Sequence, residues 1–125
     1  MNWKLFAPML LLVTAPAAAQ SMNAETFYQR ATALQKKGVM ALFSGDLKAL
    51  TKEGQAAGAK AREQRLAAIK AGQKPRFCPP QGPVSIDSKE FVSRLSAIPA
   101  TERQRIDMTE ATARILTAKF PCKSG

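Results

Sequence analysis

The chain has 125 residues, a formal net charge of +10, no histidine and two cysteines. The lack of histidine removes the side chain that serves most often as a general base and as a ligand of transition metals. A chain this short and basic is expected to form one domain that binds a partner, with no enzymatic activity, cofactor or metal site.

Residues 1–19 have the pattern of a secretory signal peptide. Lys4 precedes an apolar run from Leu5 to Val13, and small residues follow up to Ala19. We expect cleavage near Ala19, which leaves residues 20–125 as a single periplasmic domain. A membrane anchor is the alternative, but the apolar run is shorter than the roughly 20 residues that cross a bilayer core. The protein is therefore not expected to be an integral membrane protein.

Helical periodicity dominates the exported part, and no stretch alternates as a strand does. The first helix is predicted from Ala24 to Lys37, with Asn23 as its cap and Gly38 just past its end. Val39 to Phe43 then predicts a short apolar turn or helix. Tyr28 lies off the main apolar face and is interpreted as a residue at the edge of the core.

A second helix is predicted from Asp46 or Leu47 to Ala71, ended by Gly72. Much of its apolar stripe is glycine and alanine, which bury little area and let a neighbouring backbone approach. We expect this helix either to pack tightly on a neighbour or to become ordered when a partner binds. The stripe consists of Leu47, Leu50, Gly54, Ala57, Gly58, Ala61, Ala68 and Ile69.

Residues 73–83 contain four of the eight prolines and predict a linker, because proline interrupts helices. Two further helices are predicted after it, each begun by the pattern Asp-x-x-Glu and stopped by a proline. Such carboxylate pairs can do acid–base chemistry, but their spacing is that of a helix cap. The pairs are Asp87 with Glu90 and Asp107 with Glu110, and the polar link between the helices, residues 100–105, is compatible with one helical turn. The fold prediction is an all-α domain of four main helices closed by one disulfide.

The two cysteines, Cys78 and Cys122, lie near the two edges of the C-terminal part. Export places them in an oxidising compartment, where two cysteines most often pair. The alternative is two free buried thiols. A disulfide would divide the chain into a basic helical half (20–72), the linker (73–83) and a clasped helical pair (77–122). Closing a loop of this length should remove about 4 kcal/mol of unfolded-state entropy.

The middle of the chain is strongly basic. Residues 36–76 contain ten Lys and Arg against three Asp and Glu. This charge favours an acidic partner: a protein, or the anionic lipid or polysaccharide of the cell envelope. A merely solvated lysine-rich face is the alternative. Export and the scarcity of aromatic residues argue against nucleic acid. The oligomeric state stays open, a homodimer included. The candidate binding surface is Lys48, Lys52, Lys60, Arg62 and Lys70.

Residues 76–122 resemble the Rap/Tai group of periplasmic proteins, the immunity partners of type VI secretion amidase effectors. The match consists of Phe77-Cys78-Pro79, a helix ending at Pro99, and a last helix closed by Phe120-Pro121-Cys122. The resemblance implies a small helical protein with a disulfide that binds and blocks a cell-wall-cleaving amidase. Family members often carry a second cysteine pair and a Gly-aromatic motif in the first half, and residues 41–47 contain neither.

Two hypotheses follow. The first is an immunity-type inhibitor that binds one protein tightly and catalyses nothing. The second is a general envelope protein whose basic helix, about Leu47 to Ala71, binds anionic lipid or polysaccharide weakly and in a salt-sensitive way.

Overall fold

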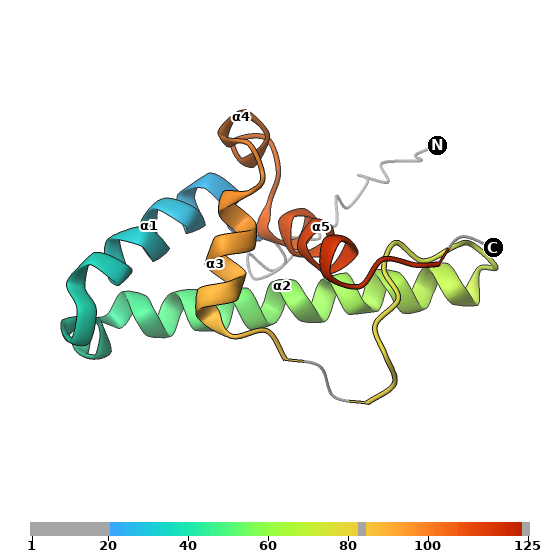
Figure 1. Cartoon of the computed structure of the whole chain (residues 1–125), viewed down its shortest axis with the longest axis horizontal. Helices are drawn as coiled ribbons and strands as arrows, with labels where there is room; N and C mark the ends of the chain where they lie inside the picture. Colours follow the sequence, from blue (N-terminus) through green and yellow to red (C-terminus); the bar gives the residue numbers. More distant parts are fainter. Residues whose placement is uncertain (1–20, 83–84, 124–125) are drawn as a thin grey trace, which may run out of the picture.

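The computed structural model describes residues 21–82 and 85–123, and the expected signal peptide lies outside them. The described part is all-α and confirms the four predicted main helices (Figure 1). One turn of helix, α4, forms in the polar link, and a 3-10 turn, η2, joins the first two helices. The elements are α1 (Ala24–Lys37), η2 (Gly38–Phe43), α2 (Gly45–Lys70), α3 (Ser88–Ser96), α4 (Ala100–Arg103) and α5 (Met108–Lys119).

Helix α2 is a rod of 26 residues that spans about 39 Å at 1.5 Å per residue. The other helices pack along one side of it (Figure 1). Helices α1 and α5 contact α2 directly, and α3 packs against both α1 and α5. The opposite side of α2 stays open to solvent, which makes it the longest exposed helical face in the described structure.

The first and last main helices begin at the same place. The side chain of Asn23 accepts hydrogen bonds from the backbone N–H groups of Glu25 and Thr26, as predicted for a cap. Two backbone hydrogen bonds join the segments that precede these two helices. Ala24 N–H donates to the Ile106 carbonyl at 3.0 Å, and Met108 N–H donates to the Met22 carbonyl at 2.8 Å. These bonds hold the start of α1 against the start of α5.

One apolar core joins the two halves of the chain, so the C-terminal part does not stand apart. Phe27 of α1 meets Phe91 of α3 edge to face, with ring centroids 5.9 Å apart. Tyr28 packs at the edge of this core, as predicted. The buried members are Ala24, Phe27, Ala31, Leu34, Leu50, Ala57, Leu95, Ile98, Met108, Ala111 and Ile115.

A buried arginine fastens the single turn of α4 to this core. Arg103 donates to the Glu25 carboxylate at 2.6 Å and to the Ser96 carbonyl at 3.3 Å. Its guanidinium lies 4.1 Å from the centroid of the Tyr28 ring. The hydrogen bond from Arg103 lowers the pKa of Glu25, because it stabilises the charged carboxylate.

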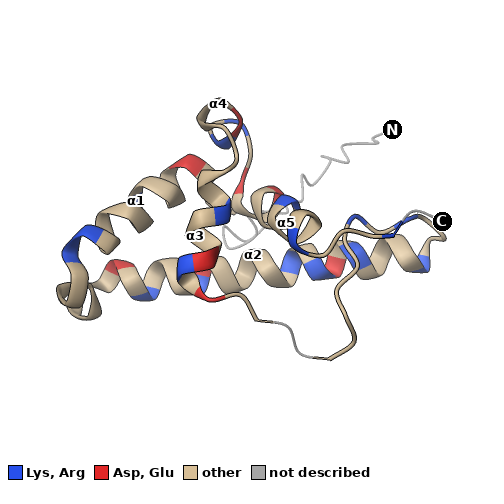
Figure 2. Ribbon diagram, viewed as in Figure 1, with Lys and Arg blue, Asp and Glu red and all other residues tan. Residues whose placement is uncertain are grey.

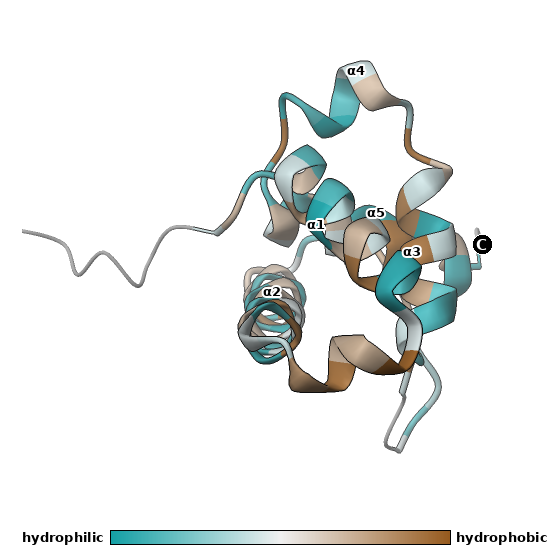
Figure 3. Ribbon diagram, turned by 90° about the vertical axis from the view of Figure 1, so that its left-hand side faces the viewer, coloured by the Kyte–Doolittle hydropathy of each residue, from teal (hydrophilic) through white to brown (hydrophobic). Residues whose placement is uncertain are grey.

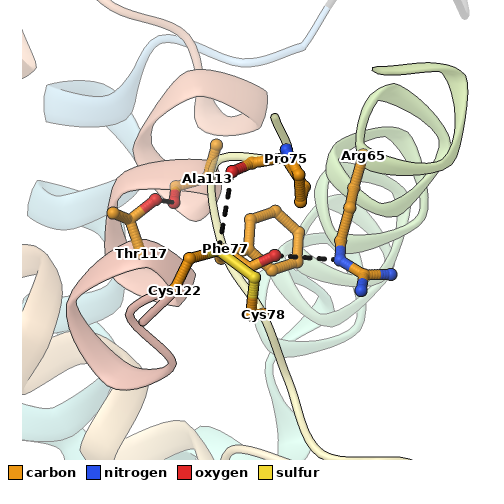
Figure 4. Close-up of a disulfide and its surroundings, with 7 residues drawn as sticks. All are labelled: Arg65, Pro75, Phe77, Cys78, Ala113, Thr117 and Cys122. Carbon is orange, nitrogen blue, oxygen red and sulfur yellow. Dashed lines mark hydrogen bonds between the residues drawn. A yellow bond between two sulfur atoms is a disulfide. The ribbon is translucent and has the colours of Figure 1, made fainter. Parts of the chain in front are cut away.

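The predicted disulfide between Cys78 and Cys122 is present and ties the linker to the end of α5 (Figure 4). Next to it, the Phe77 side chain is buried with Ala61 of α2 and Ala113 of α5. Arg65 of α2 donates to the Phe77 carbonyl at 2.9 Å. We call this region, residues 75–78 with Arg65 and Cys122, the clasp. It joins α2, the linker and α5 in one place.

Three sequence predictions need correction in α2. Ile69 does not belong to the inward stripe, because its side chain is 46% exposed. Gly54 and Gly58 do not admit a neighbouring backbone either, since a Cβ built at each meets nothing within 4 Å. The close packing of α2 instead rests on Leu50, Ala57 and Ala61, which are buried.

The carboxylate pairs lie at helix caps, as predicted, but only the aspartates make the capping hydrogen bonds. Asp87 accepts from the Glu90 N–H at 2.8 Å, and Asp107 accepts from the Glu110 N–H at 2.9 Å. The Glu90 carboxylate turns to Lys119 and Arg94 instead of back to the cap. Strong cations nearby offer it a better partner than a backbone N–H, because ion-paired hydrogen bonds are stronger than neutral ones.

Candidate binding surface on helix α2

The outer face of α2 carries most of the candidate binding residues. Lys52, Arg62 and Lys70 each lie close to a whole number of helical turns from Lys48, so the four side chains follow one line along the helix. All four are exposed. The line extends over almost the full length of α2, and Figure 2 shows Lys and Arg at intervals along this helix.

Lys60 departs from this line. It lies about a third of a turn away from Lys48 around the helix, and its side chain is half-buried. Lys60 also makes an interaction of its own within the structure. The predicted set of five is therefore a face of four cations, and Lys60 is not one of them.

The four cations on this face form no ion pair with any described residue. Most of the ion-paired carboxylates lie elsewhere: Glu90 and Glu110 pair with arginines and a lysine around α3 and α5, and Glu25 pairs with Arg103. Helix α2 carries six Lys and Arg against Asp46, Glu53 and Glu63, so its net charge is positive. Its field extends into solvent and favours an anionic partner.

Two apolar side chains lie among these cations and were not identified from the sequence. Leu66 is 50% exposed and Ile69 is 46% exposed. Together with Arg62 and Lys70 they occupy positions i, i+4, i+7 and i+8, which share one helical face. We call these four residues the α2 patch. Leu66 follows Lys48 by 18 residues, which is five whole helical turns. This spacing would have placed Leu66 on the outer face from the sequence alone.

The strongest electrostatic perturbation lies at the clasp and not on the outer face of α2. Arg76 forms a two-fold ion pair with Glu110, at 2.7 and 2.8 Å. Hydrogen bonding from Arg76 lowers the pKa of Glu110 to about 2. The carboxylate is thus ionised and paired at neutral pH, an arrangement that braces the linker against α5.

The outer face of α2 presents positive charge to solvent. No group of three or more metal-ligating side chains lies together in residues 21–82 and 85–123. Over the same ranges no helix has the length and apolarity needed to cross a membrane.

Comparison of the chain with protein-family models, curated proteins and solved structures yields no match.

Proposed function

We propose that this protein is a non-enzymatic, periplasmic binding protein, and that it acts as an immunity-type inhibitor of a cell-wall amidase effector. The α2 patch carries this proposal. Arg62 and Lys70 have no ion-pair partner among the described residues, and Leu66 and Ile69 are half exposed beside them. Apolar anchors flanked by cations on one helical face are the chemistry of a helix that lies in an acidic-rimmed groove.

The frame behind the patch suits an inhibitor. Arg65, on the same helical segment about a quarter turn from the patch, is bonded to the clasp. The disulfide and the Arg76–Glu110 pair hold that clasp to α5. A surface fixed in this way loses little conformational entropy on binding, which favours a tight complex. The cysteine–proline and aromatic–proline–cysteine motifs that resemble the Rap/Tai group form this same clasp, and they suggest the amidase as partner.

The test is capture of a partner by the processed protein from extracts of cells that secrete contact-dependent toxins, washed at low and high salt. We expect one salt-resistant protein with amidase activity, whose activity falls as the complex forms. The double variant Leu66→Ser/Ile69→Ser should weaken this complex by about 10-fold or more, since buried apolar anchors dominate binding energy. The variant Lys89→Glu, at an exposed lysine of α3, is the matched surface control and should bind normally.

The four-cation line on α2 supports the second hypothesis, a weak binder of anionic polysaccharide or lipid. It predicts diffuse capture of envelope material that is lost in high salt. Charge reversal at Lys48, Lys52 and Lys70 should abolish such binding, whereas it should mainly slow association with a single protein partner. Diffuse capture alone, with no salt-resistant protein partner, would contradict the inhibitor proposal, whereas lipid binding beside a captured protein would not.

A further inference from the structure

The turn between α1 and α2 exposes more apolar side chain than any other described segment. Val39 is 76% exposed, Met40 66%, Leu42 69% and Phe43 83%. They account for four of the six large hydrophobic residues that are exposed in the described structure, the other two being in the α2 patch. We call these four residues the apolar tip.

The apolar tip lies at one extreme end of the molecule. Helices α1 and α2 lead to it from the core, and α3 and α5 pack farther back (Figure 1). Seen from that end, η2 is a hydrophobic segment at the near side of the molecule (Figure 3). The tip is thus convex and can meet a surface before any other part of the protein does.

The charges around the tip are almost all positive. Lys36 and Lys37 end α1, and Lys48 and Lys52 follow in the first two turns of α2, all of them exposed. Asp46 is the one acidic residue in positions 35–52. It forms an ion pair with Arg30, whose hydrogen bonds lower the pKa of Asp46. The apolar tip is therefore surrounded by a positive field that no local carboxylate cancels.

An open depression of about 590 Å³ lies directly beside the tip. Leu42 and Leu47 form its apolar part, and Lys48 and Lys52 lie at its polar side with Thr51. A single anionic headgroup can approach the two ammonium groups while the neighbouring acyl region meets Leu42. The depression and the tip thus offer ionic and apolar contacts close together.

We infer that the apolar tip docks this protein onto an anionic lipid bilayer, with η2 inserted at the boundary between headgroups and acyl chains. Stable attachment to a membrane takes two signals, an apolar insertion and a basic patch, because either alone gives weak and reversible binding. The tip supplies both. A bilayer also accepts a convex apolar projection without a matching cavity, whereas a protein partner would need one. This surface is separate from the α2 patch, so a docked molecule leaves Arg62, Leu66, Ile69 and Lys70 free for a protein.

The test is flotation of the processed protein with vesicles of phosphatidylcholine alone and with an equal share of phosphatidylglycerol. We expect binding to the anionic vesicles and little to the neutral ones. The double variant Leu42→Ser/Phe43→Ser should lower the partition coefficient by about 10-fold or more, since it removes two large apolar groups from the inserted turn. The matched control is Leu66→Ser/Ile69→Ser, which also removes two exposed apolar groups and should bind like the wild type. Circular dichroism of both variants checks that they keep their helices.

A second measurement locates the tip in the bilayer. The described residues contain no tryptophan, so Phe43→Trp introduces a specific reporter in the processed protein. We expect its emission to shift to the blue on addition of anionic vesicles and to be quenched by lipids brominated on their acyl chains. Ile69→Trp should show neither change.

Equal vesicle binding by the wild type and the tip variant would overturn the proposal, and so would the absence of binding to anionic vesicles. Loss of a captured protein with the tip variant, in the absence of vesicle binding, would assign the tip to a protein groove instead. Because the α2 patch is tested by its own variant, failure of membrane docking leaves the proposed inhibition standing, and the converse also holds.

Discussion

Phe43 and Phe77 lie near opposite ends of α2, and their surroundings differ completely. The Phe77 side chain is 4% exposed and packs between α2 and α5, whereas the Phe43 side chain is 83% exposed. Around Phe77, a disulfide, a bond from Arg65 and the Arg76–Glu110 pair bring three segments together. Around Phe43, only the two helices that meet in η2 are near.

The difference shows what decides the burial of an aromatic residue in so small a domain. Both phenylalanines belong to short segments next to an end of α2. Helix α5 covers Phe77, and no comparable segment covers Phe43 in the described structure. A buried phenylalanine stabilises the fold, and an exposed one is available to another surface. The clasp end is therefore the braced end of the molecule, and the tip end is the one with exposed apolar surface. The α2 patch, on the outer face of α2, lies nearer the clasp end. Four predictions test this division.

The largest expected effect is on removal of the disulfide. The variant Cys78→Ser/Cys122→Ser should lose about 4 kcal/mol of unfolding free energy at neutral pH, because the unfolded chain regains the entropy of the open loop. Denaturation in urea measures this loss, with reduction of the wild type as an independent check. A loss below about 1 kcal/mol would show that the clasp holds without its covalent bond.

Phe77→Ala should cost about 3 kcal/mol, since it leaves a cavity against Ala61 and Ala113 and exposes their apolar surface. Phe43→Ala, the matched variant at the tip, should change the free energy of unfolding by no more than about 0.5 kcal/mol. Both are measured by denaturation in urea. Equal losses in the two variants would contradict the division of the molecule into a braced end and an end with exposed apolar surface.

The ion pair at the clasp should make stability depend on pH. The pKa of Glu110 is lowered from 4.5 to about 2 in the folded protein, so its contribution is full above pH 4.5 and is lost as the pH falls towards 2. The pair is partly exposed, and we expect it to contribute about 1 kcal/mol after screening by solvent.

Arg76→Gln should therefore reduce stability at pH 7 and make little difference near pH 2, as measured by denaturation at a series of pH values. Lys89→Gln is the control, because Lys89 has no described ion-pair partner. A constant difference between wild type and Arg76→Gln across this range would show that Glu110 is not the group responsible.

The smallest expected effect on stability comes from glycine substitutions in α2 and at the end of α1. Gly58→Ala should stabilise the protein by about 0.5 kcal/mol, because alanine has the higher helix propensity and its Cβ meets nothing within 4 Å. Gly38→Ala should instead destabilise it, since Gly38 ends α1 with a φ of +56°. Thermal unfolding of both variants distinguishes the two signs, and a loss of stability in Gly58→Ala would indicate a close contact on that face of α2.

Local sequence signals determined most of the secondary structure. The first helix was predicted with its observed bounds, Ala24–Lys37, because Asn23 and Gly38 act on the backbone within a few residues. Asp87 and Asp107 likewise marked the starts of α3 and α5. The all-α class and the disulfide also followed from the sequence, since helical period and the pairing of the only two cysteines do not depend on the details of packing.

Only the tertiary structure decided which side of α2 is covered. Spacing alone placed Ile69 in the inward stripe, and this assignment was wrong because the covered face of α2 is the one that carries Leu50, Ala57 and Ala61. Lys60, assigned to the binding surface from the basic charge of the region, lies to one side of the line of the other four cations. The exposure of the apolar tip could not be predicted either, since an apolar run is the same in sequence whether or not a neighbour covers it. Burial depends on segments distant in the chain, and in this protein their arrangement covers Phe77 and leaves Phe43 exposed.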